Sequence, residues 1–156
     1  MAEPVDLFFE SRLAAPAETV WQWITSLQGI SAEMWPYFRM TVPPKVTNLA
    51  DITVQPGERL FRSRVFLFGF LPIDYSDLTL VELTPGEGFV EQSPMGSMNL
   101  WRHERRVRPA PDGRGVILSD HLTFEPRWLR SVVTWFIRRV FQHRHEVLRQ
   151  QLGGRA

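Results

Sequence analysis

Hydrophobic and polar residues follow two different periods along the chain, and each period predicts one kind of element. Residues 6–13 alternate with a period of two, which is typical of a strand. Residues 16–27 repeat apolar side chains every three or four positions, which predicts a helix that ends at Gly29. A second short helix is expected after Ser31, whose hydroxyl can cap its first turn.

After the Pro43-Pro44 pair the pattern changes to short segments separated by turn residues. Six further strands are predicted, at residues 46–54, 58–68, 72–83, 88–92, 98–108 and 115–125. The connections between them are rich in Pro, Gly, Ser and Asp, and they are too short for the crossovers that parallel strands need. The strands are therefore expected to pair antiparallel.

The last segment, residues 127–152, has the spacing of a long helix. Its apolar stripe consists of Leu129, Val133, Phe136, Ile137, Val140, Val147 and Leu148. One strand, two helices, a run of strands and a long helix together predict an α+β fold, in which a curved antiparallel sheet wraps around the C-terminal helix. Because no repeat or Gly/Ser linker interrupts the pattern, residues 1–156 are expected to form a single domain.

Composition narrows the class of protein. The chain is 44% hydrophobic and 22% charged, and its eleven Phe and six Trp suit a large core or a ligand-lined interior. With no cysteine, disulfides and thiolate metal sites are excluded, which fits a cytoplasmic location. The first residues do not resemble a signal peptide, and no apolar stretch is long enough to cross a bilayer, so no integral membrane association is expected.

The net charge of +1 conceals an asymmetry. Residues 1–96 contain 6 basic and 12 acidic residues, whereas residues 97–156 contain 12 basic and 5 acidic residues. The arginines of the second part are spread rather than clustered, which favours a solvated exterior, and no nucleic-acid partner is expected.

Two tryptophans of the last helix lie opposite its apolar stripe. Trp128 and Trp135 stand near Arg138 and Arg139, and aromatic residues with arginine are enriched at interfaces. A membrane surface or a partner subunit, as in a homodimer, is one interpretation of this face. Singly exposed apolar residues are the other.

Asp120 is the residue that points most directly to a functional site. It shares its strand phase with Leu118, Leu122 and Phe124, so its carboxylate should point into the protein. A buried carboxylate is costly unless cations or hydrogen-bond donors surround it.

Partners for this carboxylate are available on the neighbouring strand and on the last helix. His103 and Arg105 share the inward phase of residues 98–108 with Trp101, and Arg144 lies within the helix stripe. This set is either a structural ion pair between sheet and helix or the polar anchor of an apolar pocket. His143 and His145 are two residues apart on the helix and so diverge in direction, and His103 and His121 belong to opposite strand phases. Neither a metal site nor a cofactor is therefore expected.

Several motifs resemble the START-like superfamily, also called SRPBCC, which has the helix-grip fold. They are FES at residues 9–11, APAETVW at 15–21, GFLP at 69–72, WRHER at 101–105, LSDHLTF at 118–124 and FQHRH at 141–145. The similarity runs in order along nearly the whole chain. It implies a domain that encloses a cavity for a small hydrophobic molecule.

The resemblance leaves the function open among three classes. The first is a binder or carrier of a lipid, polyketide or quinone-like ligand, with apolar walls from Trp101, Leu118, Leu122, Phe124, Phe136 and Val140, and a polar end held by His103, Arg105, Asp120 and Arg144. The second is a polyketide cyclase or dehydratase in which His103 or Asp120 moves protons. The third is a protein-interaction domain with a filled interior. Residues 34–42 are either a mobile lid or part of the core.

Overall fold

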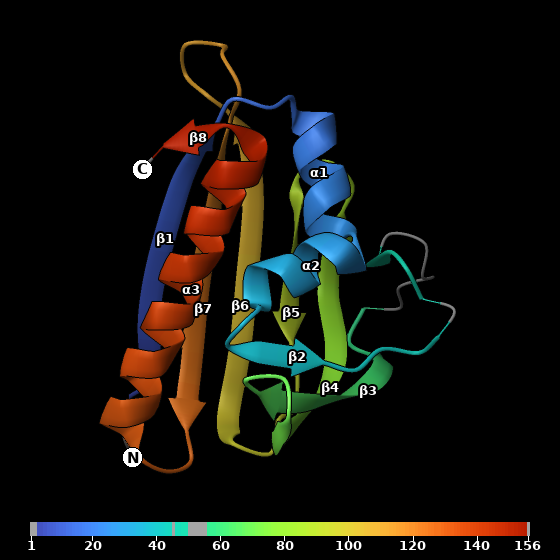
Figure 1. Cartoon of the computed structure of the whole chain (residues 1–156), viewed down its shortest axis with the longest axis vertical. Helices are drawn as coiled ribbons and strands as arrows, with labels where there is room; N and C mark the ends of the chain where they lie inside the picture. The colour runs from blue at the N-terminus through green and yellow to red at the C-terminus, as the bar shows by residue number, and fades with distance from the viewer. Residues whose placement is uncertain (1–2, 45, 50–55, 156) are drawn as a thin grey trace.

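A curved antiparallel sheet holds a long helix against its inner face (Figure 1). The computed structural model describes residues 3–44, 46–49 and 56–155. In chain order the elements are β1 (Val5–Leu13), α1 (Ala17–Thr25), α2 (Leu27–Met34), β2 (Phe38–Met40), β3 (Arg59–Leu67), β4 (Leu71–Thr84), β5 (Gly88–Gln92), β6 (Met98–Pro109), β7 (Val116–Pro126), α3 (Arg130–Leu152) and β8 (Gly154–Arg155). Across these residues the strand order is β2-β3-β4-β5-β6-β7-β1-β8.

The predicted helix-grip architecture is confirmed. Helix α3 lies over β1 and β7, and α1 and α2 lie on the same face of the sheet beside it, with α1 near β6 and α2 near β2 (Figure 1). Six of the seven predicted strands agree with the structure to within one residue at each end. β6 and β7 make the longest antiparallel pair, and in it Arg105 is directly opposite Asp120.

The first helical region differs from the prediction. A single helix was expected to end at Gly29, but the chain breaks at Ser26, which has extended backbone angles. The Ser26 hydroxyl accepts a hydrogen bond from the Gly29 N–H at 3.0 Å, so Ser26 rather than Ser31 caps the second helix. Gly29 therefore lies inside α2.

Three other expectations were wrong. The described part of the predicted strand at residues 46–54 makes only an isolated bridge between Asn48 and Ser26, and residues 50–54 lie outside the described residues. The last helix begins at Arg130 instead of residue 127, because Leu129 adopts a left-handed conformation. Leu129 is consequently exposed, although it was expected in the core stripe.

The apolar core is divided into two clusters. One lies at the end of the sheet near α1 and consists of Leu13, Val20, Ile24, Val107, Val116, Leu118, Leu148 and Leu152. The other lies farther along α3 and consists of Leu7, Met98, Leu122, Phe124, Ile137, Val140 and Phe141. On both β7 and α3, the residues between the clusters are polar: Asp120 on the strand, and Arg144 and His145 on the helix.

Gly88 at the start of β5 allows the sheet to close against β6. A Cβ atom at this position would lie 2.2 Å from the backbone oxygen of Arg105, whereas a Cβ at Gly86 would meet nothing within 4 Å. Both glycines have positive φ, so an alanine would have a strained backbone at either position. We expect Gly88→Ala to lower the free energy of unfolding by about 1–3 kcal/mol more than Gly86→Ala. Urea unfolding of the two variants measures this difference, and equal losses would contradict it.

Candidate functional site

Asp120 is completely buried at the centre of the polar layer between the two core clusters. Its Oδ1 accepts hydrogen bonds from Nε2 of His103 at 2.6 Å and Nε of Arg105 at 2.7 Å. Its Oδ2 accepts from Nη2 of Arg105 at 2.9 Å and Nε2 of His145 at 2.8 Å. The predicted cluster of Asp120, His103 and Arg105 is thus present, and Arg105 binds the carboxylate in a bidentate manner.

Glu33 on α2 is a second buried carboxylate that sequence reasoning missed. It accepts hydrogen bonds from Nη2 of Arg105 at 2.9 Å and Nε of Arg144 at 3.1 Å. Nε1 of Trp23 also donates to it, at 3.1 Å. Its position in a short helix of mixed polarity gave no signal of burial, because α2 is too short to show a clear inward stripe.

His145 was also missed, because the two-residue spacing from His143 was judged only for metal binding. The side chains do diverge: Nε2 of His143 lies 2.6 Å from the backbone oxygen of Trp35, while His145 points to Asp120. Nδ1 of His145 lies 2.7 Å from Oγ of Ser11 on β1. This histidine therefore connects α3 to both β7 and β1.

The charges of this layer balance. Burial acts to raise the pKa of Asp120, but the opposing effects of Arg105 and His103 are stronger and lower this pKa well below its ordinary value. Burial likewise acts to raise the pKa of Glu33, but Arg105 and Arg144 lower it. Two carboxylates thus face two guanidinium groups, and the layer is neutral when the histidines are uncharged.

His103 favours the neutral form. Burial lowers its pKa, and the attraction of Asp120 only partly opposes this effect. Because Asp120 is ionised and can only accept, Nε2 of His103 must carry the proton of the neutral ring. Nδ1 is then a hydrogen-bond acceptor, and it lies 4.0 Å from Oε1 of Glu91.

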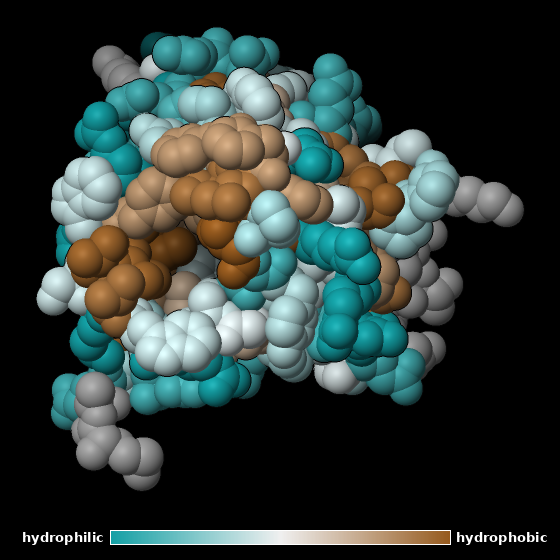
Figure 2. Space-filling view, turned by 60° about the horizontal axis from the view of Figure 1, so that its bottom comes forward, coloured by the Kyte–Doolittle hydropathy of each residue, from teal (hydrophilic) through white to brown (hydrophobic). Residues whose placement is uncertain are grey.

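A pocket of about 630 Å³ lies beside this layer, between α3, α2 and the half of the sheet formed by β3 to β6. Most of its lining side chains are apolar, including Met34, Phe38, Leu78, Phe89 and Met98. Figure 2 shows a hollow bordered by hydrophobic side chains on this face. A pure protein-interaction domain was expected to have its interior filled by aromatic side chains. The residues that line this pocket leave the space open instead.

The predicted site residues divide evenly between the pocket wall and the buried interior behind it. Trp101, His103, Phe136, Val140 and Arg144 line the pocket. Arg105, Leu118, Asp120, Leu122 and Phe124 do not line it, although all five are buried. Their placement has a simple cause: α3 packs directly on β7 and covers its inward side chains, so the opening lies toward β3, β4 and β5 instead.

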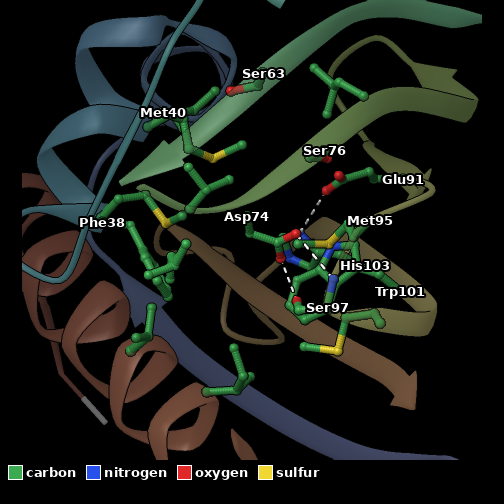
Figure 3. Close-up of a pocket in the computed structure, with 18 of the residues that line it drawn as sticks. Phe38, Met40, Ser63, Asp74, Ser76, Glu91, Met95, Ser97, Trp101 and His103 are labelled. Atoms are coloured by element: carbon green, nitrogen blue, oxygen red, sulfur yellow. Dashed lines mark hydrogen bonds and ion pairs between the residues drawn. The ribbon is translucent and has the colours of Figure 1, made fainter. Parts of the chain in front are cut away.

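Several polar groups of the pocket wall were not predicted (Figure 3). Asp74 on β4 accepts a hydrogen bond from the Ser97 backbone N–H at 3.1 Å, and its other oxygen accepts from the Ser97 hydroxyl. Glu91 on β5 accepts from Oγ of Ser93 at 2.7 Å. No sequence signal marked these residues, because the bulges between β3, β4 and β5 alter the alternation on which strand faces were assigned.

Exposed apolar side chains from the first part of α3 and the segment before it also line the pocket. Trp128, Leu129, Val132 and Trp135 are each more than half exposed. The two tryptophans were expected on a face away from the core, and they are exposed, but they border the pocket as well. Contact with a membrane surface or a second subunit stays a prediction.

No helix among the described residues is long and apolar enough to cross a membrane. In the same part of the chain, no group of three or more His, Cys, Asp or Glu side chains is arranged to hold a metal ion. The cytoplasmic location expected from the sequence stays a prediction.

Comparisons with known proteins identify a family and a set of structures with a similar fold. A model of the family described as "Domain of unknown function (DUF8410)" matches residues 11–152. No curated protein matches the chain. Among solved structures, protein CV1439 from Chromobacterium violaceum has a TM-score of 0.68 at 16% identity, with 97% of this chain and 98% of that chain covered.

Two further solved structures are similar over nearly their whole length. A START superfamily protein from Mycobacterium smegmatis has a TM-score of 0.64 at 11% identity, with 97% of this chain and 98% of that chain covered. The Zhui aromatase/cyclase from Streptomyces sp. R1128 has a TM-score of 0.66 at 12% identity, with 96% and 94% covered. The START-like fold predicted from the sequence is confirmed.

Proposed function

Because the chain belongs to the DUF8410 family of domains of unknown function and has the START-like fold, we propose its function from the pocket itself: it binds or carries a small hydrophobic molecule. The observation that carries this proposal is the apolar pocket of about 630 Å³ between sheet and helix. Ligand sites are typically concave, mostly apolar and equipped with a few polar groups, and this pocket has each property. A lipid, polyketide or quinone-like molecule would suit it.

The polar layer supports the pocket in two ways. His103 and Arg144 reach the wall and orient a polar part of the ligand. Arg105 and Asp120 lie behind them and act as positioning residues, since they fix the ring of His103 and the carboxylate of Glu33 to which Arg144 is bound. In this proposal the ion pairs are structural and also give the wall its polar end.

Titration with the neutral fluorophore N-phenyl-1-naphthylamine tests the proposal. We expect wild-type protein to bind the probe with enhanced fluorescence, and Val140→Phe to weaken binding at least tenfold, because the added ring occupies pocket volume. Val147→Phe on the same helix is the matched control, because Val147 is half-buried and does not line the pocket. Absence of probe binding by the folded wild type would contradict the proposal, and so would equal binding by the two variants.

The alternative function, a polyketide cyclase or dehydratase, now depends on His103. Its ring lines the pocket and favours the neutral form, as a general base must, whereas the lowered pKa of Asp120 makes this carboxylate a poor base. If His103→Ala left the turnover of candidate polyketone substrates unchanged, this alternative would be excluded.

A further inference from the structure

Two buried serines in the pocket wall have hydroxyl groups without a hydrogen-bond partner. Among the described residues, the buried side-chain atoms without a partner are Oγ of Ser63, Oγ of Ser76 and Oγ1 of Thr134. Ser63 and Ser76 line the pocket and are 0% and 1% exposed, whereas Thr134 does not line it. A buried hydroxyl without a partner costs about 1–3 kcal/mol, so the pair calls for an explanation.

The two serines form one local feature. Ser63 on β3 is directly opposite Ser76 on β4 in the antiparallel register, and their side chains reach the same pocket. Side chains of such a pair have Cβ atoms about 4.5–5.5 Å apart, so both hydroxyls can approach one ligand oxygen. Figure 3 shows them on neighbouring strands of the pocket wall.

Several other polar groups of the pocket wall already have partners within the protein. Asp74 is bound to Ser97, Glu91 accepts from Ser93, and Arg144 donates to Glu33. Two methionines, Met40 and Met95, also line the pocket, and the backbone of Met95 pairs with that of Ser76 in an isolated bridge. Because methionine is unbranched and flexible, a ligand can displace it and reach the hydroxyls.

Charge restricts the kind of ligand group that fits. Of the described residues that line the pocket, Arg144 is the only one with a permanent positive charge, and it is paired with Glu33. Asp74 and Glu91 add carboxylates to the wall on the serine side. A ligand carboxylate would lack a cation there and would be repelled, whereas an uncharged oxygen would be accepted.

We propose that the opposed hydroxyls of Ser63 and Ser76 form a recognition subsite for an uncharged carbonyl or hydroxyl oxygen of an otherwise apolar ligand. The inference rests on the proposed function and deepens it. It assigns the ligand to the class of neutral ketones, quinones and alcohols, as opposed to free fatty acids. Each hydroxyl donates one hydrogen bond to the ligand oxygen, which satisfies both groups at once.

Displacement of N-phenyl-1-naphthylamine by matched naphthalenes tests the subsite. 2-Acetylnaphthalene and 2-ethylnaphthalene have nearly the same shape and differ in the carbonyl oxygen, while 2-naphthoate carries a charge. We expect wild-type protein to prefer the ketone over the hydrocarbon about tenfold, because two hydrogen bonds to a neutral acceptor give about this factor. It should bind 2-naphthoate less tightly than the ketone.

The double variant Ser63→Ala/Ser76→Ala should lose the preference for the ketone and still bind 2-ethylnaphthalene. Its thermal unfolding midpoint should be at least that of the wild type, because neither hydroxyl has a partner to lose. Thr134→Val removes an unpartnered hydroxyl outside the pocket and should keep the preference.

The subsite proposal would be overturned if the double variant kept the tenfold preference, if wild-type protein bound ketone and hydrocarbon equally, or if 2-naphthoate bound most tightly. Failure of the proposed function has a different signature. In that case the fluorophore itself would not bind to folded wild-type protein.

Discussion

Replacing Arg105 with methionine is expected to lower the free energy of unfolding by about 3–5 kcal/mol, because it leaves two buried carboxylates without their main cation. Arg105 is fully buried and bonds to both Asp120 and Glu33. Since domains of this kind are stable by about 5–15 kcal/mol, the variant should be close to unfolding at room temperature. Urea unfolding followed by circular dichroism measures the change.

Arg106→Met provides the matched control. Arg106 is adjacent in sequence, points to the other face of β6 and pairs with Glu82 and Glu104 at the surface. Exposed pairs contribute about 0–1 kcal/mol, so this variant should remain near wild-type stability. Equal losses of stability for the two variants would contradict the view that the buried ion pairs stabilise the fold more than the exposed ones do. Adding Glu33→Gln to Arg105→Met should recover part of the loss, because one uncompensated charge is removed.

Stability should also fall steeply on acidification. The pKa values of Glu33 and Asp120 are lowered in the folded protein from their ordinary values of 4.5 and 3.8. The folded state therefore binds fewer protons than the unfolded state, and the stabilisation is fully present above pH 4.5 and is lost as the pH falls below it. Each extra proton taken up on unfolding adds a slope of about 1.4 kcal/mol per pH unit. Because burial also lowers the pKa of His103 from 6.5, a shallower loss should begin below pH 6.5.

Urea midpoints between pH 7.5 and pH 3 measure this dependence. Repeating the measurement at higher salt separates the contribution of the buried carboxylates from that of exposed carboxylates. Exposed carboxylates such as Asp6 and Asp112 also have lowered pKa values, through bonds to Thr123 and Arg12 respectively, but salt screens exposed pairs much more than buried ones. The loss of stability at acid pH should therefore persist in 0.5 M sodium chloride. Constant stability from pH 7.5 to pH 3.5 would show that the buried carboxylates are not held ionised.

The fold could be predicted largely because strand and helix periods are strong in this sequence. The phase of β7, in which Asp120 stands among Leu118, Leu122 and Phe124, was sufficient to place the carboxylate inside. The short hairpin loop then restricted its partner to His103 or Arg105, and both are bonded to it. Boundaries failed where single residues decide them, as at Ser26 and Leu129.

The pocket was harder to predict, because it depends on how far elements stand apart rather than on periodicity. Glu33 and His145 reach the polar layer from two helices, and no sequence pattern relates these positions to each other. Ser63 and Ser76 lie on strands whose pairing contains a bulge, so the wall that they form could only be found from the folded chain. The wall residues predicted on β7, Leu118, Leu122 and Phe124, do not line the pocket, because α3 packs against β7 and the space opens toward β3 and β4.

Native mass spectrometry of protein purified without organic solvent tests the central claim most directly. We predict that the wild type carries the additional mass of a small neutral organic molecule, or takes up added 2-acetylnaphthalene. The Val140→Phe variant should do neither, and Val147→Phe should behave as the wild type. A wild-type protein that is folded, free of bound molecules in every preparation and unable to take up the added ketone would contradict the account.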